Sequence, residues 1–94
     1  MQKCSTVSFS GHALRRMFER SVSTKSVLHM LNEGEVIANY PNDQPYPSTL
    51  LLGWVLDRAI HVVVAQNKAD YACYVVTAYY PSKELWSADF RTRR

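Results

Sequence analysis

The residue types best suited to chemistry recur at four-residue intervals near the start of the chain. His12, Arg16 and Arg20 are each four positions apart, so on a helix they point to one side, within an arc of about 80°. The helix dipole disfavours a charged imidazolium in the first turn, so His12 would be a neutral general base. The two arginines would bind a phosphate through paired N–H donors. The simpler interpretation is a solvated polar helix face with a histidine near its start.

A second group of candidates lies on predicted strands. His61 is the one polar residue in the apolar run IHVVVA. A single histidine in such a run is more often a hydrogen-bonded core residue than a catalyst, and we favour that interpretation from the pattern alone. Thr77 and Tyr79 share one face of a later strand, because strand side chains alternate. If the strands pair in register, His61, Thr77 and Tyr79 lie on one sheet surface, where the last two would orient a substrate.

Basic charge is concentrated in two segments. The 94 residues carry a formal net charge of +3, with +3 in the first 20, +3 in the last four and −3 between them. If the two segments meet, they form a patch for phosphate that includes Arg15 and Arg91. Trp86 and Phe90 beside the terminal arginines match the composition that stacks bases and binds a nucleic-acid backbone. The alternatives are a solubilising tail, a solvated helix face and two aromatic residues that cover the core.

Hydrophobic periodicity predicts two helices followed by strands. Ser10 and Ser23 are placed as N-caps, and Gly34 is placed to end the second helix. The expected helices span residues 11–20 and 24–33. The expected strands span residues 6–9, 35–40, 49–56, 60–66 and 71–80, and residues 83–90 form either a short helix or a last strand. Three prolines make residues 41–48 a loop.

These elements predict one α+β domain over residues 1–94. Short connections between the late strands favour antiparallel neighbours. The apolar stripes of the helices must be covered by the sheet; they consist of Leu14, Met17, Phe18, Val27, Leu28 and Leu31. We therefore expect two N-terminal helices packed on one face of a mainly antiparallel, four- to five-stranded sheet, followed by a basic C-terminal tail.

Composition argues against several classes of protein. No apolar run is long enough to span a membrane, and the first ten residues lack the apolar region of a signal peptide. Cys4 and Cys73 are expected to be free, buried thiols in a reduced, cytoplasmic protein. Scattered thiols and histidines predict no metal site, and the lack of nucleotide-binding glycine motifs predicts no cofactor.

Five motifs, in this order, resemble a bacterial family known as domain of unknown function 4258. They are SGHALRRMFER, VLHMLNEGEVI, YPNDQPYPS, IHVVV and VVTAYYP, and the resemblance runs from about residue 9 to 86. Members look like small toxins of the RelE, BrnT and MqsR types, which are ribonucleases with helices that precede a sheet. The resemblance implies a RelE-like fold, RNA as the substrate, and an acidic or zinc-finger antitoxin as the partner.

The resemblance also implies roles for particular residues. The family's polar helix motif falls on His12, Arg16 and Arg20, and its strand histidine falls on His61. A metal-independent ribonuclease needs a base, an acid and cations that stabilise the phosphorane-like charge. The two histidines would share the acid and base roles, in an order that the sequence leaves open.

Two other classes of function remain alternatives. The chain would be a non-catalytic module that binds protein or nucleic acid through its basic helix, or a small-molecule-binding domain that uses its tyrosine-rich sheet. The position of His61 relative to His12 discriminates between these classes, because only catalysis needs the two imidazoles in one cleft.

Overall fold

Both helices begin where a serine can cap them. In the computed structural model, which describes all 94 residues, α1 spans Gly11–Glu19 and α2 spans Thr24–Glu33. The backbone N–H of Ala13 donates to the Ser10 hydroxyl at 3.0 Å, and that of Ser26 donates to Ser23 at 3.0 Å. These bonds satisfy N–H groups that a helix start leaves without a partner. The predicted bounds of α2 are confirmed, and α1 ends one residue earlier than predicted.

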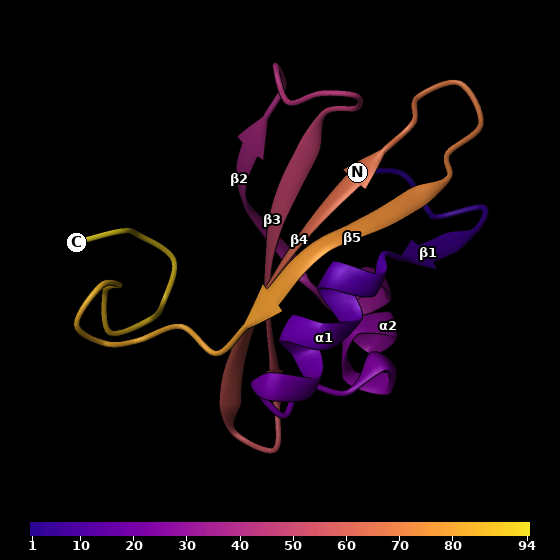
Figure 1. The fold of residues 1–94 in the computed structure, drawn as a ribbon. Coiled ribbons are helices and arrows are strands. Elements are labelled where there is room, and N and C mark those ends of the chain that lie inside the picture. Colours follow the sequence, from indigo (N-terminus) through magenta and orange to yellow (C-terminus); the bar gives the residue numbers. More distant parts are fainter.

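The strands form one mixed sheet of five, in the order β1-β5-β4-β3-β2 (Figure 1). Their bounds are β1 Val7–Phe9, β2 Glu35–Tyr40, β3 Ser48–Val55, β4 Arg58–Gln66 and β5 Cys73–Tyr79. Strands β2 to β5 are antiparallel neighbours, as the short connections predict. The sheet is nevertheless not purely antiparallel, because β1 pairs with β5 in parallel. This first strand precedes both helices, so the fold is α+β with a strand at its N-terminal end.

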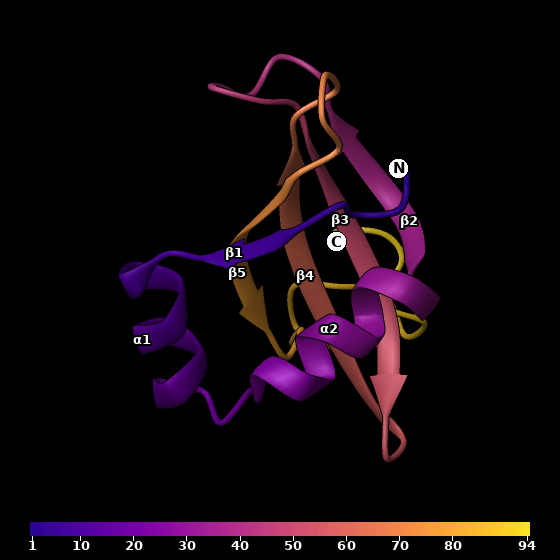
Figure 2. The same ribbon diagram turned by 90° about the vertical axis from the view of Figure 1, so that its right-hand side faces the viewer.

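The sheet is covered on both faces, by different parts of the chain. The helices lie on one face, and residues 82–94, called here the C-terminal segment, lie on the other (Figure 2). The helix face buries a cluster that includes Met17, Val27 and Met30. The opposite face buries a smaller cluster that includes Leu50 and Leu52 together with Trp86 and Phe90 of the C-terminal segment. Neither helix has the length and apolar character of a membrane span.

The predicted burial of both apolar helix stripes is wrong in part. Met17 and Val27 are buried, but 42 % of Leu14, 86 % of Phe18 and 42 % of Leu28 are exposed. The reason is the position of α1, which packs against β5 near one side of the sheet. A helix placed there can cover only part of its apolar arc, and Leu14 and Phe18 fall outside the contact.

The expected helix or strand over residues 83–90 is also not formed. The C-terminal segment consists of turns, with one isolated bridge between Trp86 and Arg93. Trp86 and Phe90 are each 8 % exposed and pack on the sheet. Their burial corresponds to the alternative in which these aromatic residues cover the core.

The two cysteines are joined in a disulfide, which corrects the expectation of free thiols. Cys4 precedes β1 and Cys73 begins β5, and the parallel pairing of these strands sets Val7 opposite Cys73. Their separation of 69 positions in the sequence gave no sign of this pairing. The pairing of β1 with β5 brings the two thiols together. The distance between the cysteines along the sequence does not predict this pairing.

Breaking the disulfide should destabilise the protein. Cys4→Ala should lower the free energy of unfolding by about 2–4 kcal/mol, because the cross-link closes a long loop in the unfolded chain. Urea denaturation of both proteins, with and without dithiothreitol, measures the effect. Reductant should lower the stability of the wild type and leave the Cys4→Ala variant unchanged. Equal stability of the oxidised and reduced wild type would contradict the prediction.

Leu28 and Met30, two positions apart on α2, test which face of the helix is turned toward the sheet. Met30 is 1 % exposed, so Met30→Ala should cost about 2–5 kcal/mol of stability. Leu28 is 42 % exposed, so Leu28→Ala should cost no more than about 1 kcal/mol. Chemical denaturation of the two variants measures both costs. An equal or reversed order would show that α2 is rotated about its axis relative to the structure.

Candidate functional site

His61 lies at the centre of the face that the C-terminal segment covers. It is 0 % exposed and lies opposite Leu52 of β3 and Tyr79 of β5 in the sheet register. Its Nε2 lies 2.9 Å from the carbonyl oxygen of Phe90, and its Nδ1 lies 3.2 Å from the Tyr79 hydroxyl. Since a carbonyl only accepts, Nε2 carries the proton, and in the neutral ring Nδ1 accepts from the Tyr79 O–H.

Burial favours the neutral form of this histidine. Removal from water lowers the pKa of His61 below its usual 6.5, and the hydrogen bond to the Phe90 carbonyl opposes that shift. The Trp86 ring packs edge-on, with its centroid 4.5 Å from that of the imidazole, and the Tyr79 ring packs in the same manner at 5.3 Å. His61 is therefore a neutral imidazole that aromatic rings and two hydrogen bonds hold in place.

Arg20 extends this arrangement to the edge of the sheet. One Nη of Arg20, the residue that caps the end of α1, donates to the Thr77 hydroxyl at 3.1 Å and to the Ala78 carbonyl at 3.1 Å. Because β1 pairs with β5 only at Cys73–Val75, the rest of the β5 edge is open to Arg20.

Arg20 and Thr77 form one hydrogen-bonded pair, and Tyr79 and His61 form a second; the two pairs together are called here the polar track. Thr77 and Tyr79 are two positions apart on β5, and the register sets them opposite Val63 and His61. Burial raises the pKa of the Tyr79 phenol, while the charges of Arg93 and Arg20 lower it in part. Tyr79 therefore stays protonated and can donate a hydrogen bond.

The structure does not bring His12 to His61. His12 is exposed in the first turn of α1, whereas the ring nitrogens of His61 bind Tyr79 and Phe90. Arg15 and Arg16 are also exposed on α1, and an Arg16 Nη lies 4.0 Å from a Glu19 carboxylate oxygen. The candidate residues thus form two groups, an exposed basic helix and a buried histidine, with Arg20 between them.

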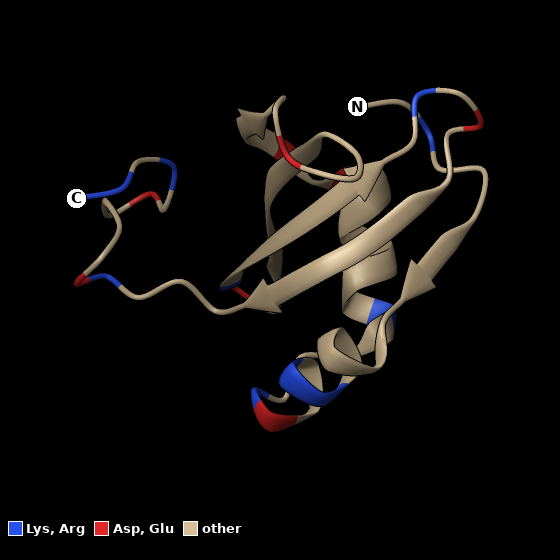
Figure 3. Cartoon of the chain, turned by 45° about the horizontal axis from the view of Figure 1, so that its top comes forward, with Lys and Arg blue, Asp and Glu red and all other residues tan.

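The two basic segments do not join into one patch. α1 and the C-terminal segment lie on opposite faces of the sheet, and their Lys and Arg residues are well separated (Figure 3). Arg91 binds the Glu35 carboxylate through two N–H groups at 2.7 and 3.0 Å. Arg94 donates to the carbonyls of Lys83 and Trp86. The terminal arginines therefore hold the segment together and attach it to β2, rather than forming a basic tail in solution.

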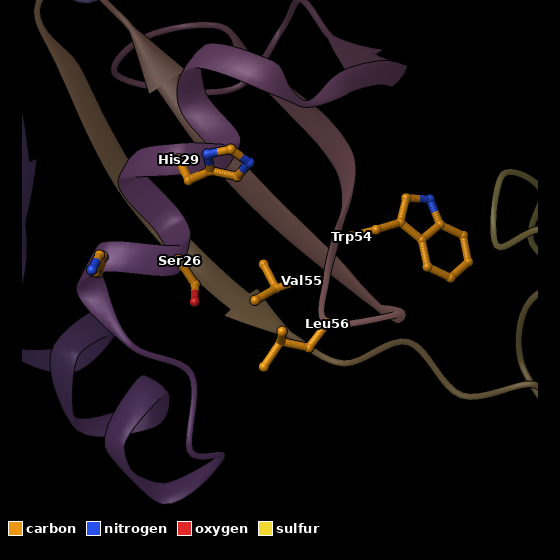
Figure 4. Close-up of a pocket in the computed structure, with 6 residues that line it drawn as sticks. Ser26, His29, Trp54, Val55 and Leu56 are labelled. Carbon is orange, nitrogen blue, oxygen red and sulfur yellow. The ribbon is translucent and has the colours of Figure 1, made fainter.

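Sequence reasoning missed an open hollow between α2 and the β3–β4 hairpin (Figure 4). It measures about 370 Å³, and its lining includes His29, Trp54 and Leu56. Leu56 is 97 % exposed and has a φ of 50°, a conformation that leucine seldom adopts. None of the predicted site residues lines this hollow, and no group of three His, Cys, Asp or Glu side chains is placed to hold a metal ion.

The lowered pKa of His61 predicts loss of stability in mild acid. Below about pH 6.5 the unfolded chain binds a proton that the folded protein excludes, so the free energy of unfolding falls as the pH drops toward the folded-state pKa. In His61→Gln the amide can still donate to the Phe90 carbonyl, but it does not titrate. Thermal melts between about pH 7 and about pH 5 should therefore show a steeper fall for the wild type than for the variant. Parallel curves for the two proteins would contradict the prediction.

Comparison with known proteins identifies the family. Residues 9–80 match the model of the domain of unknown function DUF4258, so the match covers more than half of the chain. No curated protein and no solved structure gives a significant match. The likeness to RelE, BrnT and MqsR toxins therefore stays a prediction, whereas the family itself is confirmed. The chain belongs to the DUF4258 family.

Proposed function

We propose that this protein binds RNA and cleaves it without a metal ion, as the ribonuclease toxin of a toxin–antitoxin pair. The observation that carries the proposal is the polar track, which connects the basic helix α1 to a neutral histidine. Its groups form two hydrogen-bonded pairs, Arg20 with Thr77 at 3.1 Å and His61 with Tyr79 at 3.2 Å. Thr77 and Tyr79 are two positions apart on β5. Cations, donors and a proton acceptor are the groups that phosphodiester cleavage requires.

The chemistry is transfer of the phosphoryl group to the neighbouring ribose hydroxyl. A base removes the proton of the 2′-hydroxyl, and its oxygen attacks the phosphorus and forms a 2′,3′-cyclic phosphate. The bond to the 5′-oxygen breaks, and that oxygen receives a proton from an acid. His12 is the accessible base, and Arg16 and Arg20 stabilise the charge on the phosphoryl oxygens. The acid is the Tyr79 hydroxyl, whose proton leaves its hydrogen bond with His61 Nδ1 and passes to the 5′-oxygen, after which the phenolate regains a proton from water. His61 orients that hydroxyl. Because the structure holds His12 apart from Tyr79 and His61, the proposal requires the two groups to come together around the RNA.

The remaining candidates would position the RNA. Arg15 is exposed on α1 and adds a phosphate contact, and Thr77 holds Arg20 at the edge of β5. Trp86 and Arg91 lie in the C-terminal segment, where Trp86 packs on His61 and Arg91 binds Glu35. They reach RNA only if that segment moves.

RNA cleavage places the action of the protein in the cytoplasm. Cytosolic proteins rarely keep disulfides. The Cys4–Cys73 pair would therefore be a dithiol there, and the fold must be stable without the bond.

A protein-binding module is the second candidate, and two observations favour it. Both ring nitrogens of His61 are occupied, so the imidazole has no position for a substrate in this conformation. Leu14 and Phe18 are exposed on α1 beside Arg15, around an open groove. An apolar surface next to a cation suits an acidic partner such as an antitoxin.

The ribonuclease proposal is tested with the purified protein and a mixed RNA pool in EDTA. The wild type should cleave the RNA, and its expression should arrest growth. His12→Ala, and Arg16→Ala combined with Arg20→Ala, should lower the cleavage rate by about 10²-fold or more. Cleavage should also weaken with salt, because phosphate contacts release counterions.

Lys68→Ala provides the control for loss of positive charge, because Lys68 is exposed on the turn between β4 and β5. Its cleavage rate should match that of the wild type, and thermal melts should show that every variant is folded. RNA that stays intact both with and without ribosomes would reject the ribonuclease proposal and leave the binding module. If cleavage survives His12→Ala combined with Tyr79→Phe, the assigned acid and base roles are rejected, and the ribonuclease proposal itself stands.

A further inference from the structure

The C-terminal segment is a self-contained unit in its backbone hydrogen bonding. Every backbone–backbone hydrogen bond of residues 82–94 stays within the segment, and none reaches a strand or a helix. The bonds join Leu85 and Trp86 to Ser82, Ser87 to Thr92, Phe90 to Ser87, and Arg94 to Leu85. A segment with no backbone–backbone bond to the sheet can leave the sheet without breaking ladder bonds.

Few contacts hold the segment on the sheet. Its polar bonds to the rest of the protein are the one between His61 Nε2 and the Phe90 carbonyl and the paired bonds between Arg91 and Glu35. The Arg91–Glu35 pair is about half exposed on both sides, so water screens it. The remaining attachment is apolar, through the rings of Trp86 and Phe90.

The groups that cover His61 resemble those of a bound nucleotide. The Phe90 carbonyl oxygen accepts from Nε2, as a phosphate oxygen would, and the Trp86 ring packs against the imidazole in a T-shaped pair, an aromatic contact that a base could also make. The family match ends at residue 80, so the cover lies outside the part of the chain that defines the family. The candidate catalytic histidine lies inside the matched part, and its accessibility depends on residues outside it.

We propose that the C-terminal segment is an autoinhibitory cover that occupies the RNA position over His61 and must leave the sheet before the polar track can act. The proposal rests on the proposed ribonuclease function, because that function identifies RNA as the ligand that the cover excludes. The cover itself is a property of the fold and can be tested without RNA. Displacement would free Nε2 of His61 and expose Tyr79 on the same surface.

The first experiment compares two phenylalanine variants of the full-length protein. Phe90→Ala removes an attachment ring of the cover, and Phe18→Ala removes a ring that is 86 % exposed on α1, away from the cover. Reaction of His61 with diethylpyrocarbonate, followed by mass spectrometry, reports access to the imidazole. Phe90→Ala should react at least about tenfold faster than the wild type, because truncation of a buried ring favours the detached state. Phe18→Ala should react at the wild-type rate.

Hydrogen exchange distinguishes detachment of the cover from unfolding. In Phe90→Ala the amides of Val62 and Val64 on β4 should keep their protection while His61 reacts faster. If these amides lose protection in proportion to the gain in His61 reactivity, the segment is part of the core and the proposal is wrong. Unchanged His61 reactivity in Phe90→Ala would also reject it.

A charge exchange tests the same cover without removing a ring. Glu35→Lys sets like charges opposite each other and should speed the reaction of His61. Adding Arg91→Glu to Glu35→Lys restores an opposite pair and should slow the reaction again. Failure of the double variant to reverse the single variant would reject the role of this pair in holding the cover. This test remains informative if Phe90→Ala does not fold.

Cleavage of a mixed-sequence single-stranded RNA oligonucleotide separates the two proposals. If both hold, Phe90→Ala should cleave at least about tenfold faster than the wild type, in line with its gain in His61 reactivity. If His61 becomes reactive and no RNA is cleaved, the cover stands and the ribonuclease function is rejected. If RNA is cleaved at the wild-type rate while His61 becomes reactive, His61 is not needed and the cover is not inhibitory.

Discussion

The hydrogen bond from His61 Nε2 to the Phe90 carbonyl joins two parts of the protein that are 29 positions apart in the sequence. On one side is a strand in the middle of the sheet, and on the other is an irregular segment at the end of the chain. A buried imidazole without that acceptor would leave an unsatisfied N–H in an apolar layer, which is costly. The bond therefore fixes the tautomer of His61, the orientation of the Tyr79 hydroxyl and the position of the C-terminal segment together.

The helices show how far local chemistry determines this fold. Ser10 and Ser23 each accept the N–H bond of a helix start, so both starts follow from the identity of one residue and its neighbours. The strand bounds also follow closely from alternation and from the prolines of the β2–β3 loop. Exposure of Leu14 and Phe18 could not be predicted, because it depends on where α1 lies relative to the sheet, which no local pattern encodes.

The candidate site was predictable as a set of residues but not as an arrangement. Periodicity selects His12, Arg16 and Arg20, and the polar interruption of an apolar run selects His61. Only the β4–β5 register and the open edge of β5 show that Arg20 connects with Thr77 while His12 stays apart. The burial of His61 results from Trp86 and Phe90, whose sequence neighbourhood predicted a short helix or a last strand that the structure does not form. The disulfide was missed for a related reason, since it depends on a pairing between the first strand and the last.

That pairing also constrains how the chain reaches its folded state on the ribosome. Val7 faces Cys73 in the sheet register, so the first strand emerges from the exit tunnel long before its partner has been synthesised. The meander from β2 to β5 can assemble from consecutive segments, whereas β1 must wait in an unpaired form. During synthesis residues 7–9 thus remain without their partner strand, and an unpaired strand can pair with other chains. The short length of β1, which spans only Val7–Phe9, limits the risk of aggregation, because three residues offer another chain few hydrogen bonds.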